Sequence, residues 1–436
     1  MIEGYFKLLL TYLCYVLICI GLLDMNCGKG SSMNELSALH FYSDFEAGAA
    51  TDFHVRGDGA IGFSIPTEPG GDIVEYPASS SVGEYLWFYF KVVGDGKKQL
   101  EFVVENAFGA HQTGWRWKIA KPVFSRDGKT WVRTKYTRYS YLRHQLWRRG
   151  IKLLGKPEFR FRAPFTAETL WVAYSYPYTN SDLNSFIEHI HEYSGVTVST
   201  IGKSAEKRDI LKVTIAGSSK ATGEQLEQIW LVGREHPGET PASFVCEGFI
   251  RALLEDAAGK QLRGVYSFSV IPIINVDGVA HGYYYHNANG VNLGFDWEDD
   301  KAIETRLLRQ AIAPDLKKGA LRLMINLHSS NDPTKGHYFL QMRASELRPR
   351  DLEFQRSIFQ TATGIYPQLQ GHSPVKLWDI PGITGIALYR QYGVYCLYLE
   401  SSYDRGADGS IVTPESLRET GAALVKALAR VLLSDK

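Results

Sequence analysis

The sequence pattern of this chain changes near residue 180, from short strands alone to alternating strands and helices. This change limits the folds that the chain can adopt. From about residue 38 to 178 the sequence carries short segments that alternate in period two, such as "EYLWFYFKVVG" and "PEFRFRAPF". These segments are rich in aromatic and β-branched residues, and Gly, Asp and Pro separate them. The pattern predicts an N-terminal antiparallel β-sandwich.

After residue 180, strands and helices alternate, which predicts an α/β domain with a largely buried central sheet. The expected strands are "QIWLVGREH", "YSFSVIPIIN", "LRLMINLHSS" and "VYCLYLES". The expected helices cover residues 181–193, 240–257, 300–314, 350–363 and 414–433. No linker rich in Gly, Ser or Pro separates the two parts, so we expect domains at 38–178 and 180–436 that pack on each other.

The composition is that of a globular protein with a large core. Among 436 residues, 44% are apolar and 22% are charged, and the formal net charge is +1. A net charge so small gives no field that would recruit nucleic acid or an anionic membrane. With no nucleic-acid-binding signature in the sequence, we expect no nucleic-acid partner.

One stretch, from Arg133 to Lys152, is locally basic and contains no Asp or Glu. Its ordinary interpretation is a solvated strand and loop face, because clustered charges usually lie in water. The alternative is an anion-attracting wall beside a functional site.

Residues 8–23, "LLLTYLCYVLICIGLL", form an apolar run that follows Lys7. The run is short for a membrane span and is typical of a signal-peptide core, so residues 1–30 are expected to be a signal peptide or an N-terminal anchor. We therefore expect a secreted or periplasmic protein that touches a membrane only if this segment is retained. Lipidation at Cys27 and a true start at Met33, which would leave the protein in the cytoplasm, are the alternatives.

The folded part holds two cysteines, Cys246 and Cys396, in apolar surroundings. Two cysteines without a short spacing make neither a disulfide framework nor a zinc knuckle. We expect both to be small core residues.

Three polar side chains follow expected strands at their carboxyl ends. His236 follows "QIWLVG", His328 ends "LRLMIN" and Glu400 ends "VYCLYL". Ligands gather at the carboxyl ends of strands in open α/β sheets, so these side chains are expected to share one crevice. The tight turn at residues 237–238 would aim His236 and Glu239 at the same point.

Two imidazoles and one carboxylate match a catalytic zinc site, in which the fourth position stays open. Zinc lowers the pKa of water in that position towards about 7, so that a nearby carboxylate can take its proton. We therefore expect one zinc ion held by His236, Glu239 and His328, with Glu400 as the general base.

Four segments, in this order and spacing, resemble the zinc metallocarboxypeptidase family: "HPGE", "NVDGV", "NLHSS" and "YLESS". The aromatic N-terminal region, with "WFYFKVVG", "FVVENA" and "SYPYTNSDL", is similar to the β-sandwich of the cytosolic-carboxypeptidase subfamily. Members of that subfamily act on peptide C-termini and side-chain glutamates. The resemblance implies a mixed central sheet, the same three zinc ligands and the same base.

The chain departs from the family at two arginine positions. Where the family has the arginine that stabilises the oxyanion, this chain reads "GYYYH", with Tyr285 or a neighbour at that place. Where the family has an Asn-Arg pair that grips the terminal carboxylate, this chain has Gly294 and Phe295. No arginine lies between Arg263 and Arg306, so an alignment gap cannot restore either one.

The expected substrate-binding residues are Tyr285, Asn292 and Phe295. A phenolic donor from the tyrosines at 283–285 and an apolar wall at Phe295 would favour a neutral or aromatic group. Alternatively, these aromatic side chains pack the pocket shut, or a cation from elsewhere reaches the site. The candidates for that cation are Arg234, Lys335, Arg343 and the basic stretch.

The sequence therefore favours a zinc hydrolase of the carboxypeptidase type that cuts an amide bond in a peptide-like substrate. A second hypothesis is a zinc amidase, esterase or endopeptidase that requires no terminal carboxylate. A third is a catalytically weak binding protein that keeps the fold. The fold alone cannot decide among them, because function resides in the site.

Overall fold

The computed structural model describes residues 38–70, 85–96, 98–110, 114–218, 226–330, 336–374 and 382–434. The predicted leader at residues 1–30 lies outside these ranges. Within them, every helix is too short or too polar to cross a bilayer.

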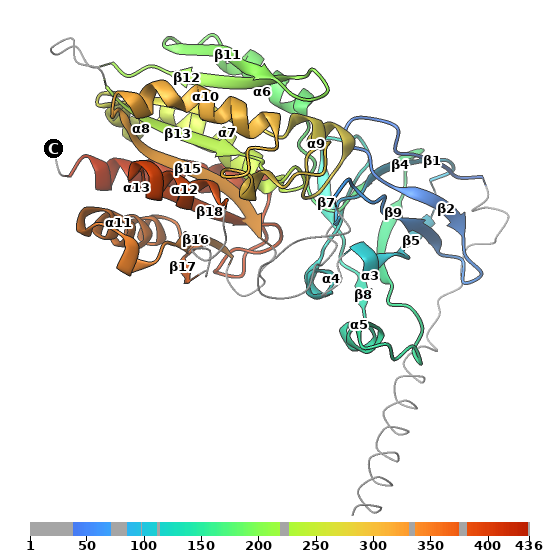
Figure 1. Ribbon diagram of the computed structural model, residues 1–436. Helices are drawn as coiled ribbons and strands as arrows, with labels where there is room; N and C mark the ends of the chain where they lie inside the picture. Colours follow the sequence, from blue (N-terminus) through green and yellow to red (C-terminus); the bar gives the residue numbers. More distant parts are fainter. Residues whose placement is uncertain are drawn as a thin grey trace, which may run out of the picture.

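The N-terminal part contains two five-stranded sheets, as the aromatic period-two pattern predicts (Figure 1). The first has the order β1 (His40–Tyr42), β4 (Tyr89–Val93), β10 (Thr169–Ala173), β6 (Val123–Ser125), β7 (Trp131–Arg133). The second has the order β2 (Thr51–Val55), β3 (Ile61–Ser64), β5 (Lys98–Val104), β9 (Phe159–Phe165), β8 (Thr137–Tyr139). All pairs are antiparallel except β3 and β5, which are parallel. Strand β9, "FRFRAPF", alternates buried and half-buried residues, so its three phenylalanines and Ala163 face the core.

Three short helices accompany the sandwich: α3 (Ala107–Ala110), α4 (Trp115–Ile119) and α5 (Tyr141–Arg148). Helix α5 lies inside the basic stretch, so the interpretation of that stretch as strand and loop alone is wrong. The physical reason is a helix cap: the Ser140 hydroxyl accepts a hydrogen bond from the backbone N–H of Arg143 at 3.2 Å.

The C-terminal part is built on an eight-stranded mixed sheet. Its order is β11 (Val196–Lys203), β12 (Asp209–Ile215), β14 (Tyr266–Ile271), β13 (Glu227–Gly233), β15 (Leu321–Ser330), β18 (Cys396–Ser402), β16 (His337–Gln341), β17 (Leu369–Pro374). The four central strands, from β14 to β18, run parallel. Pairs β11 with β12, β12 with β14 and β18 with β16 are antiparallel, which confirms the mixed sheet.

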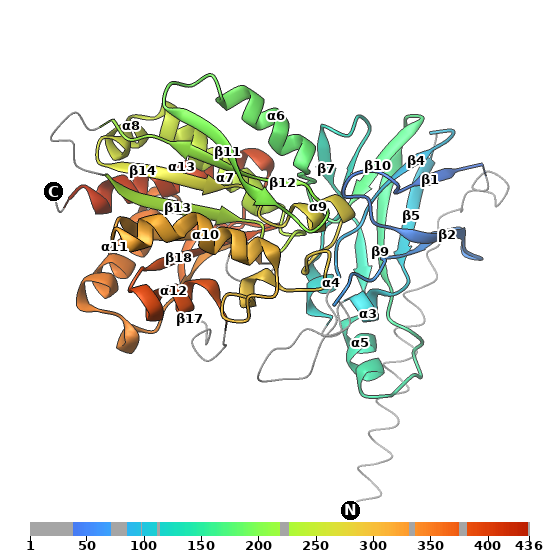
Figure 2. The ribbon, with the colours of Figure 1, turned by 45° about the horizontal axis from the view of Figure 1, so that its top comes forward.

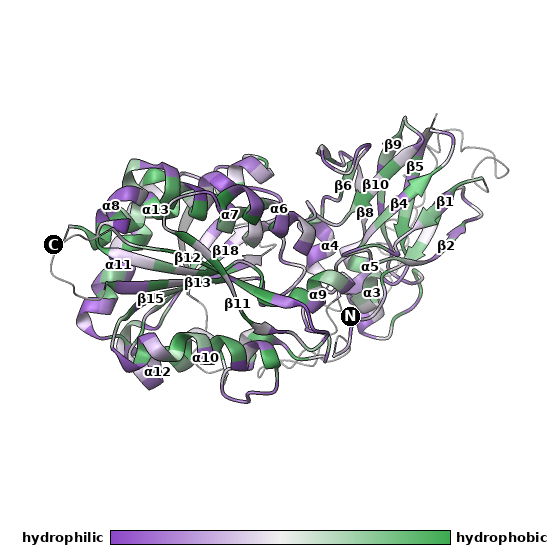
Figure 3. Ribbon diagram, turned by 90° about the horizontal axis from the view of Figure 1, so that it is seen from above, coloured by the Kyte–Doolittle hydropathy of each residue, from purple (hydrophilic) through white to green (hydrophobic). Residues whose placement is uncertain are grey.

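Helices cover both faces of this sheet (Figure 2, Figure 3), and the central strands between them are mostly buried. The helices are α6 (Asn180–Ile190), α7 (Pro241–Glu255), α8 (Ala257–Arg263), α9 (Val276–His281), α10 (Ile303–Lys317), α11 (Pro349–Ile365), α12 (Thr384–Tyr392) and α13 (Pro414–Leu432), with 3-10 turns η1 (Leu293–Phe295) and η2 (Ala344–Glu346). Helices α7 and α13 pack on one face, and α10 and α12 lie on the other (Figure 3).

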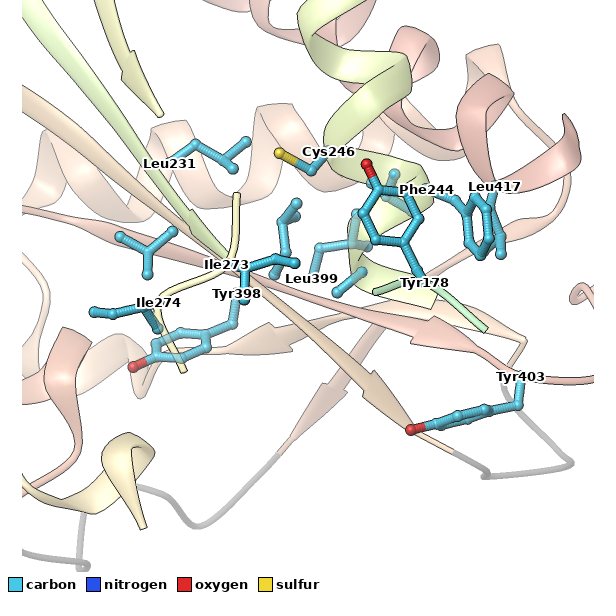
Figure 4. Close-up of a cluster of buried hydrophobic side chains, with 14 of the residues drawn as sticks. Tyr178, Leu231, Phe244, Cys246, Ile273, Ile274, Tyr398, Leu399, Tyr403 and Leu417 are labelled. Atoms are coloured by element: carbon cyan, nitrogen blue, oxygen red, sulfur yellow. The ribbon is translucent and has the colours of Figure 1, made fainter. Parts of the chain in front are cut away.

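The five long helices expected from the sequence are present, with boundaries shifted by at most a few residues. The β11–β12 hairpin and the short helices α8, α9 and α12 were not expected. Both cysteines are buried free thiols, as predicted. Cys246 lies among apolar core side chains such as Leu231 (Figure 4).

The sandwich and the α/β part pack on each other, and one buried apolar cluster contains residues of both. Polar contacts also join them. The Arg133 guanidinium donates to the Asp404 carboxylate at 2.7 Å, and the N–H of Ala47 donates to the carbonyl of Ala280 at 2.9 Å. The sandwich is therefore placed to influence the strand ends of the α/β sheet.

Candidate active site

The turn after β13 is held in a strained shape by a buried arginine. Arg234 has a left-handed backbone with φ of 61°, which is uncommon for a residue with a side chain. Its guanidinium is buried and donates through Nε to the Pro237 carbonyl at 2.9 Å and through Nη1 to Ser243 Oγ at 2.8 Å. These bonds compensate the strain and close the turn, so that His236 and Glu239 face each other.

The three residues predicted to bind metal come together as one buried cluster. His236 Nδ1 lies 3.0 Å from Glu239 Oε1, and His328 Nδ1 lies 3.1 Å from Glu239 Oε2. The two Nδ1 atoms are 3.2 Å apart. One ligand atom from each residue lies within 4.8 Å of the others, an arrangement that could hold a metal ion.

The outer nitrogens of both imidazoles also have partners. His236 Nε2 lies 3.0 Å from Asn292 Oδ1, and His328 Nε2 lies 3.2 Å from Glu235 Oε2. An acceptor at the outer nitrogen places the proton there and leaves Nδ1 available to a metal. Both rings are therefore oriented with the coordinating atom towards the cluster.

Glu235 is a site residue that the sequence reasoning missed. Its carboxylate is buried and also accepts hydrogen bonds from Asn326 Nδ2 and Thr384 Oγ1, each at 3.0 Å. The available signal was a second carboxylate directly before His236. That signal was overlooked because its partner, His328, lies on another strand.

Electrostatics make the cluster a place that favours positive charge. Burial opposes ionisation of Glu239, but His236 and His328 outweigh it and hold the pKa of Glu239 well below its usual value. Burial likewise opposes a charged His328, yet its hydrogen bonds to Glu235 and Glu239 raise its pKa well above the usual value. A proton on His328 and a metal ion compete for the same electrons, so metal binding must release that proton.

Glu400 lies beside the cluster, as predicted. In the parallel pair of β15 and β18 it is the direct register partner of His328, so both side chains point to the same face of the sheet. Burial and the negative charge of Glu239 raise the pKa of Glu400 to about 7. A carboxylate with a pKa near neutrality is suited to accept a proton from water.

The substrate side of the cluster is aromatic and neutral. The Tyr285 ring stacks on the His236 imidazole with centroids 4.1 Å apart and planes 15° apart. A Cβ added at Gly294 would lie 3.2 Å from His236 Nε2, so any larger residue there would press on this imidazole. Phe295 is partly buried and follows Gly294 in the turn η1.

Asn292, predicted to bind substrate, has its side-chain oxygen engaged within the protein. The oxygen lies against His236 Nε2 and also accepts the backbone N–H of Gly294 at 3.0 Å. Asn292 therefore supports His236 through its side-chain oxygen, and the substrate contact expected from the sequence stays a prediction.

A carboxylate from the sandwich fixes the tyrosine segment 284–286. Glu68 is buried and accepts the backbone N–H groups of Tyr284, Tyr285 and His286, the latter two at 2.9 and 3.1 Å. It also lies 2.8 Å from His286 Nδ1. The position of Tyr285 against the metal cluster thus depends on a residue more than 200 positions earlier.

The domain content of the chain follows from two matches to protein families. Residues 183–311 match the zinc carboxypeptidase family, and residues 41–174 match the cytosolic carboxypeptidase N-terminal domain. Both parts of the chain are therefore similar to zinc carboxypeptidases. The two matched segments correspond to the α/β part and to the sandwich, and zinc is the metal that the buried cluster fits.

Curated relatives of this chain include the cytosolic carboxypeptidase 6 of mouse and that of Caenorhabditis elegans. The mouse protein is 26% identical over 289 residues, which cover 63% of this chain and 51% of the relative. The Caenorhabditis elegans protein is 27% identical over 216 residues, covering 49% and 46%. An uncharacterised protein of Zymomonas mobilis is 31% identical over 221 residues, covering 50% and 52%. The chain spans about half the length of these relatives.

Solved structures share the fold over both domains. A metallo-carboxypeptidase from Burkholderia cenocepacia aligns with a TM-score of 0.78 at 20% identity, covering 92% of this chain and all of that one. A metallo-carboxypeptidase from Pseudomonas aeruginosa aligns with a TM-score of 0.74 at 18% identity, covering 91% and 100%. These similarities confirm the predicted combination of a sandwich and a carboxypeptidase-like α/β domain.

Proposed function

We propose that this protein is a zinc-dependent hydrolase that cleaves an amide bond in a peptide-like substrate. The observation that carries the proposal is the convergence of His236, Glu239 and His328 in one buried cluster, with Glu400 in register beside His328. The donor set of two imidazoles and one carboxylate is that of catalytic zinc sites. Bound zinc would polarise the substrate carbonyl and make the attacking water more acidic.

The protein groups supply the remaining steps. Glu400 accepts a proton as the water oxygen bonds to the carbonyl carbon, and then passes a proton to the amide nitrogen as the C–N bond breaks. Burial and the nearby Glu239 carboxylate raise the pKa of Glu400 above its usual value, which helps it to hold a proton between the two transfers. Glu235 and Asn292 hold the two imidazoles in place throughout.

The neutral residues on the substrate side support a second candidate function, which requires no terminal carboxylate on the substrate. Because Gly294 and Phe295 stand where the family grips a terminal carboxylate, an amidase, esterase or endopeptidase activity is the second candidate. A neutral wall cannot form the paired charge-assisted hydrogen bonds that arginine forms with a carboxylate. Export through the N-terminal segment also remains a proposal.

The test combines metal analysis with a panel of peptides whose C-termini are free or blocked. We expect one zinc per chain, hydrolysis that stops when a chelator removes the metal, and recovery when zinc is returned. Stoichiometric zinc without hydrolysis of any peptide or ester would support the binding-protein alternative. Hydrolysis that persists without metal would contradict the proposed mechanism.

A further inference from the structure

The proposed hydrolysis requires a positive charge that the α/β part does not supply at the usual place. As water attacks, negative charge develops on the carbonyl oxygen, and a hydrogen-bond donor placed there contributes strongly to catalysis. Tyr285 stands at the arginine position for this task, and residues 264–305 contain no arginine. The inference below therefore rests on the proposed function and asks where the missing charge comes from.

One cation expected from the sequence, Arg234, is engaged within its own turn. Arg234 is buried, and its guanidinium bonds to the Pro237 carbonyl and Ser243 within its own turn. Burial lowers the pKa of the Arg234 guanidinium to about 10, because a buried positive charge is unfavourable. Arg234 is therefore a structural residue of the turn.

Two further candidates are held elsewhere. Arg133, at the start of the basic stretch, pairs with Asp404 at 2.7 Å and donates to the Val412 carbonyl at 3.3 Å. Arg343 pairs with Glu346 at 3.0 Å beside the exposed turn η2. Lys335 lies outside the described residues.

Arg116, which the sequence reasoning did not consider, approaches the site from the sandwich. It lies on α4, and its Nη1 donates to the phenolic oxygen of Tyr284 at 3.0 Å. Its guanidinium carbon is 4.9 Å from the centroid of the Trp115 ring and 5.6 Å from that of Tyr284. Two aromatic rings and a hydroxyl thus fix the guanidinium, which limits the entropy lost when it binds a partner.

The tyrosine that Arg116 contacts is joined to the metal cluster through stacked rings. Tyr284 is fully buried, and its ring lies parallel to Tyr285 within 13° at 6.2 Å between centroids. Tyr285 in turn stacks on His236. Arg116 therefore approaches the same segment in which the family carries its oxyanion arginine.

The positive charge of Arg116 also has a small effect on groups at the carboxyl end of β18. Its positive charge is one of the influences that lower the pKa of Glu400, against the larger raising effect of burial. It acts in the same direction on Tyr403, three residues further along the chain. This influence agrees with the contact between Arg116 and Tyr284, which is the geometric basis for placing Arg116 beside the tyrosine segment.

We propose that Arg116 replaces the absent arginine and stabilises the negative charge on the carbonyl oxygen of the scissile amide. The step itself is the hydrolysis described above: water adds to the carbonyl carbon, the C–N bond breaks, and a carboxylic acid and an amine result. The sandwich domain thereby contributes a catalytic residue to a site whose metal ligands belong entirely to the α/β domain.

The test compares Arg116→Ala and Arg116→Lys with Lys118→Ala in the zinc-loaded full chain. Lys118 is a matched control, since it lies on the same helix, is exposed and faces the Tyr141 ring. We expect Arg116→Ala to lower kcat by about 10² to 10³ with little change in KM, the usual effect of removing an oxyanion donor. Arg116→Lys should retain part of the rate, guanidinium ions should partly rescue Arg116→Ala, and Lys118→Ala should stay within about twofold of wild type.

A binding measurement separates this proposal from the proposed function. A phosphinate peptide carries its negative charge where the tetrahedral intermediate would, so its affinity reports on the oxyanion contact without turnover. We expect Arg116→Ala to weaken phosphinate binding at least tenfold, with zinc content and near-ultraviolet circular dichroism unchanged. If wild type hydrolyses nothing, the proposed function fails and the phosphinate affinities alone decide the role of Arg116.

A rate and a phosphinate affinity within about twofold of wild type, in a zinc-loaded and folded variant, would overturn the proposal. If Arg116→Ala does not fold, Arg116→Gln keeps a long polar side chain and is judged by the same two measurements. A loss of zinc in Arg116→Gln would also overturn it, because Arg116 would then support the metal site.

Discussion

The two halves of the candidate site differ in what holds them. In the metal half, His328 and Glu400 lie on adjacent parallel strands, and His236 and Glu239 occupy a short turn directly after a third. In the substrate half, residues 284–286 and the turn η1 are loop segments, and Glu68 of the sandwich anchors the first of them. Sheet hydrogen bonds fix the reacting groups, while a neighbouring domain fixes the surface that meets the substrate.

Because sheet strands hold one half of the site and loops form the other, substrate specificity can change while the metal-binding residues stay the same. Register in a parallel sheet permits little variation, because a shift by one residue would turn every side chain to the other face. Loops tolerate substitution more readily. We accordingly propose that the metal half keeps the three ligands of a zinc site, whereas the substrate half has neutral residues at the two positions where the resemblance implies arginines.

The largest effect is expected from His328→Ala, which should remove nearly all the zinc and with it the activity. The substitution deletes one of three ligands and leaves the buried carboxylates of Glu235 and Glu239 without their shared imidazole. Metal analysis of the purified variant provides the measurement. His281→Ala is the matched control, because His281 is an exposed imidazole paired with Glu206. Full zinc occupancy in His328→Ala would show that the ligand assignment is wrong.

Glu400→Gln should lower turnover by about 10² to 10⁴ while zinc and fold are kept, the usual contribution of a general base. In wild type the rate should fall as the pH drops below the pKa of Glu400, because the base must be unprotonated to act. That pKa is raised to about 7 without metal, and a bound cation would bring it back down towards its usual value. This acidic limb of kcat/KM should be absent from the residual activity of Glu400→Gln.

The control for this experiment is Glu353→Gln, a substitution of an exposed carboxylate on α11. It should leave both the rate and the pH profile unchanged. Unchanged turnover in Glu400→Gln would exclude Glu400 as the base, and a simultaneous loss of zinc would show that its role is structural.

Glu235→Gln should weaken zinc binding by about 10- to 100-fold, because the carboxylate orients His328 and increases its basicity. Competition with a chelator of known affinity measures the change. Thr384→Val removes only the hydroxyl that donates to Glu235, so its effect should be smaller. Equal zinc affinity in wild type and Glu235→Gln would mean that the contact between Glu235 and His328 does not tune the metal site.

The smallest effect is expected in the choice between a free C-terminal carboxylate and its amide. With Gly294 and Phe295 in place of an arginine clamp, the preference for the free acid should stay below about tenfold, or about 1.4 kcal/mol in the transition state. Kinetics on paired peptides under identical conditions give this ratio. Phe295→Arg should raise it, since a guanidinium could then pair with the carboxylate. A preference of several hundredfold in wild type would reveal a carboxylate clamp formed by other residues.

Much of this protein could be predicted from local sequence patterns. Period-two aromatic segments predict the sandwich, and alternating strands and helices predict the α/β domain, because side-chain periodicity follows from backbone geometry. The three metal-binding candidates and Glu400 could be located as well. Each follows an apolar strand, and parallel strands bring their carboxyl ends to one edge.

What the sequence could not reveal depends on contacts between residues far apart in the chain. The helix α5 within the basic stretch depends on a single cap at Ser140, and the contact of Asn292 with His236 depends on how η1 meets the turn after β13. Glu68 and Arg116 reach the site only because the sandwich packs against the strand ends of the other domain. Side-chain periodicity is a local property that the sequence determines by itself. Tertiary packing alone decides which carboxylate or guanidinium contacts which partner across the domain boundary. No local sequence pattern encodes how close two residues of different domains will lie.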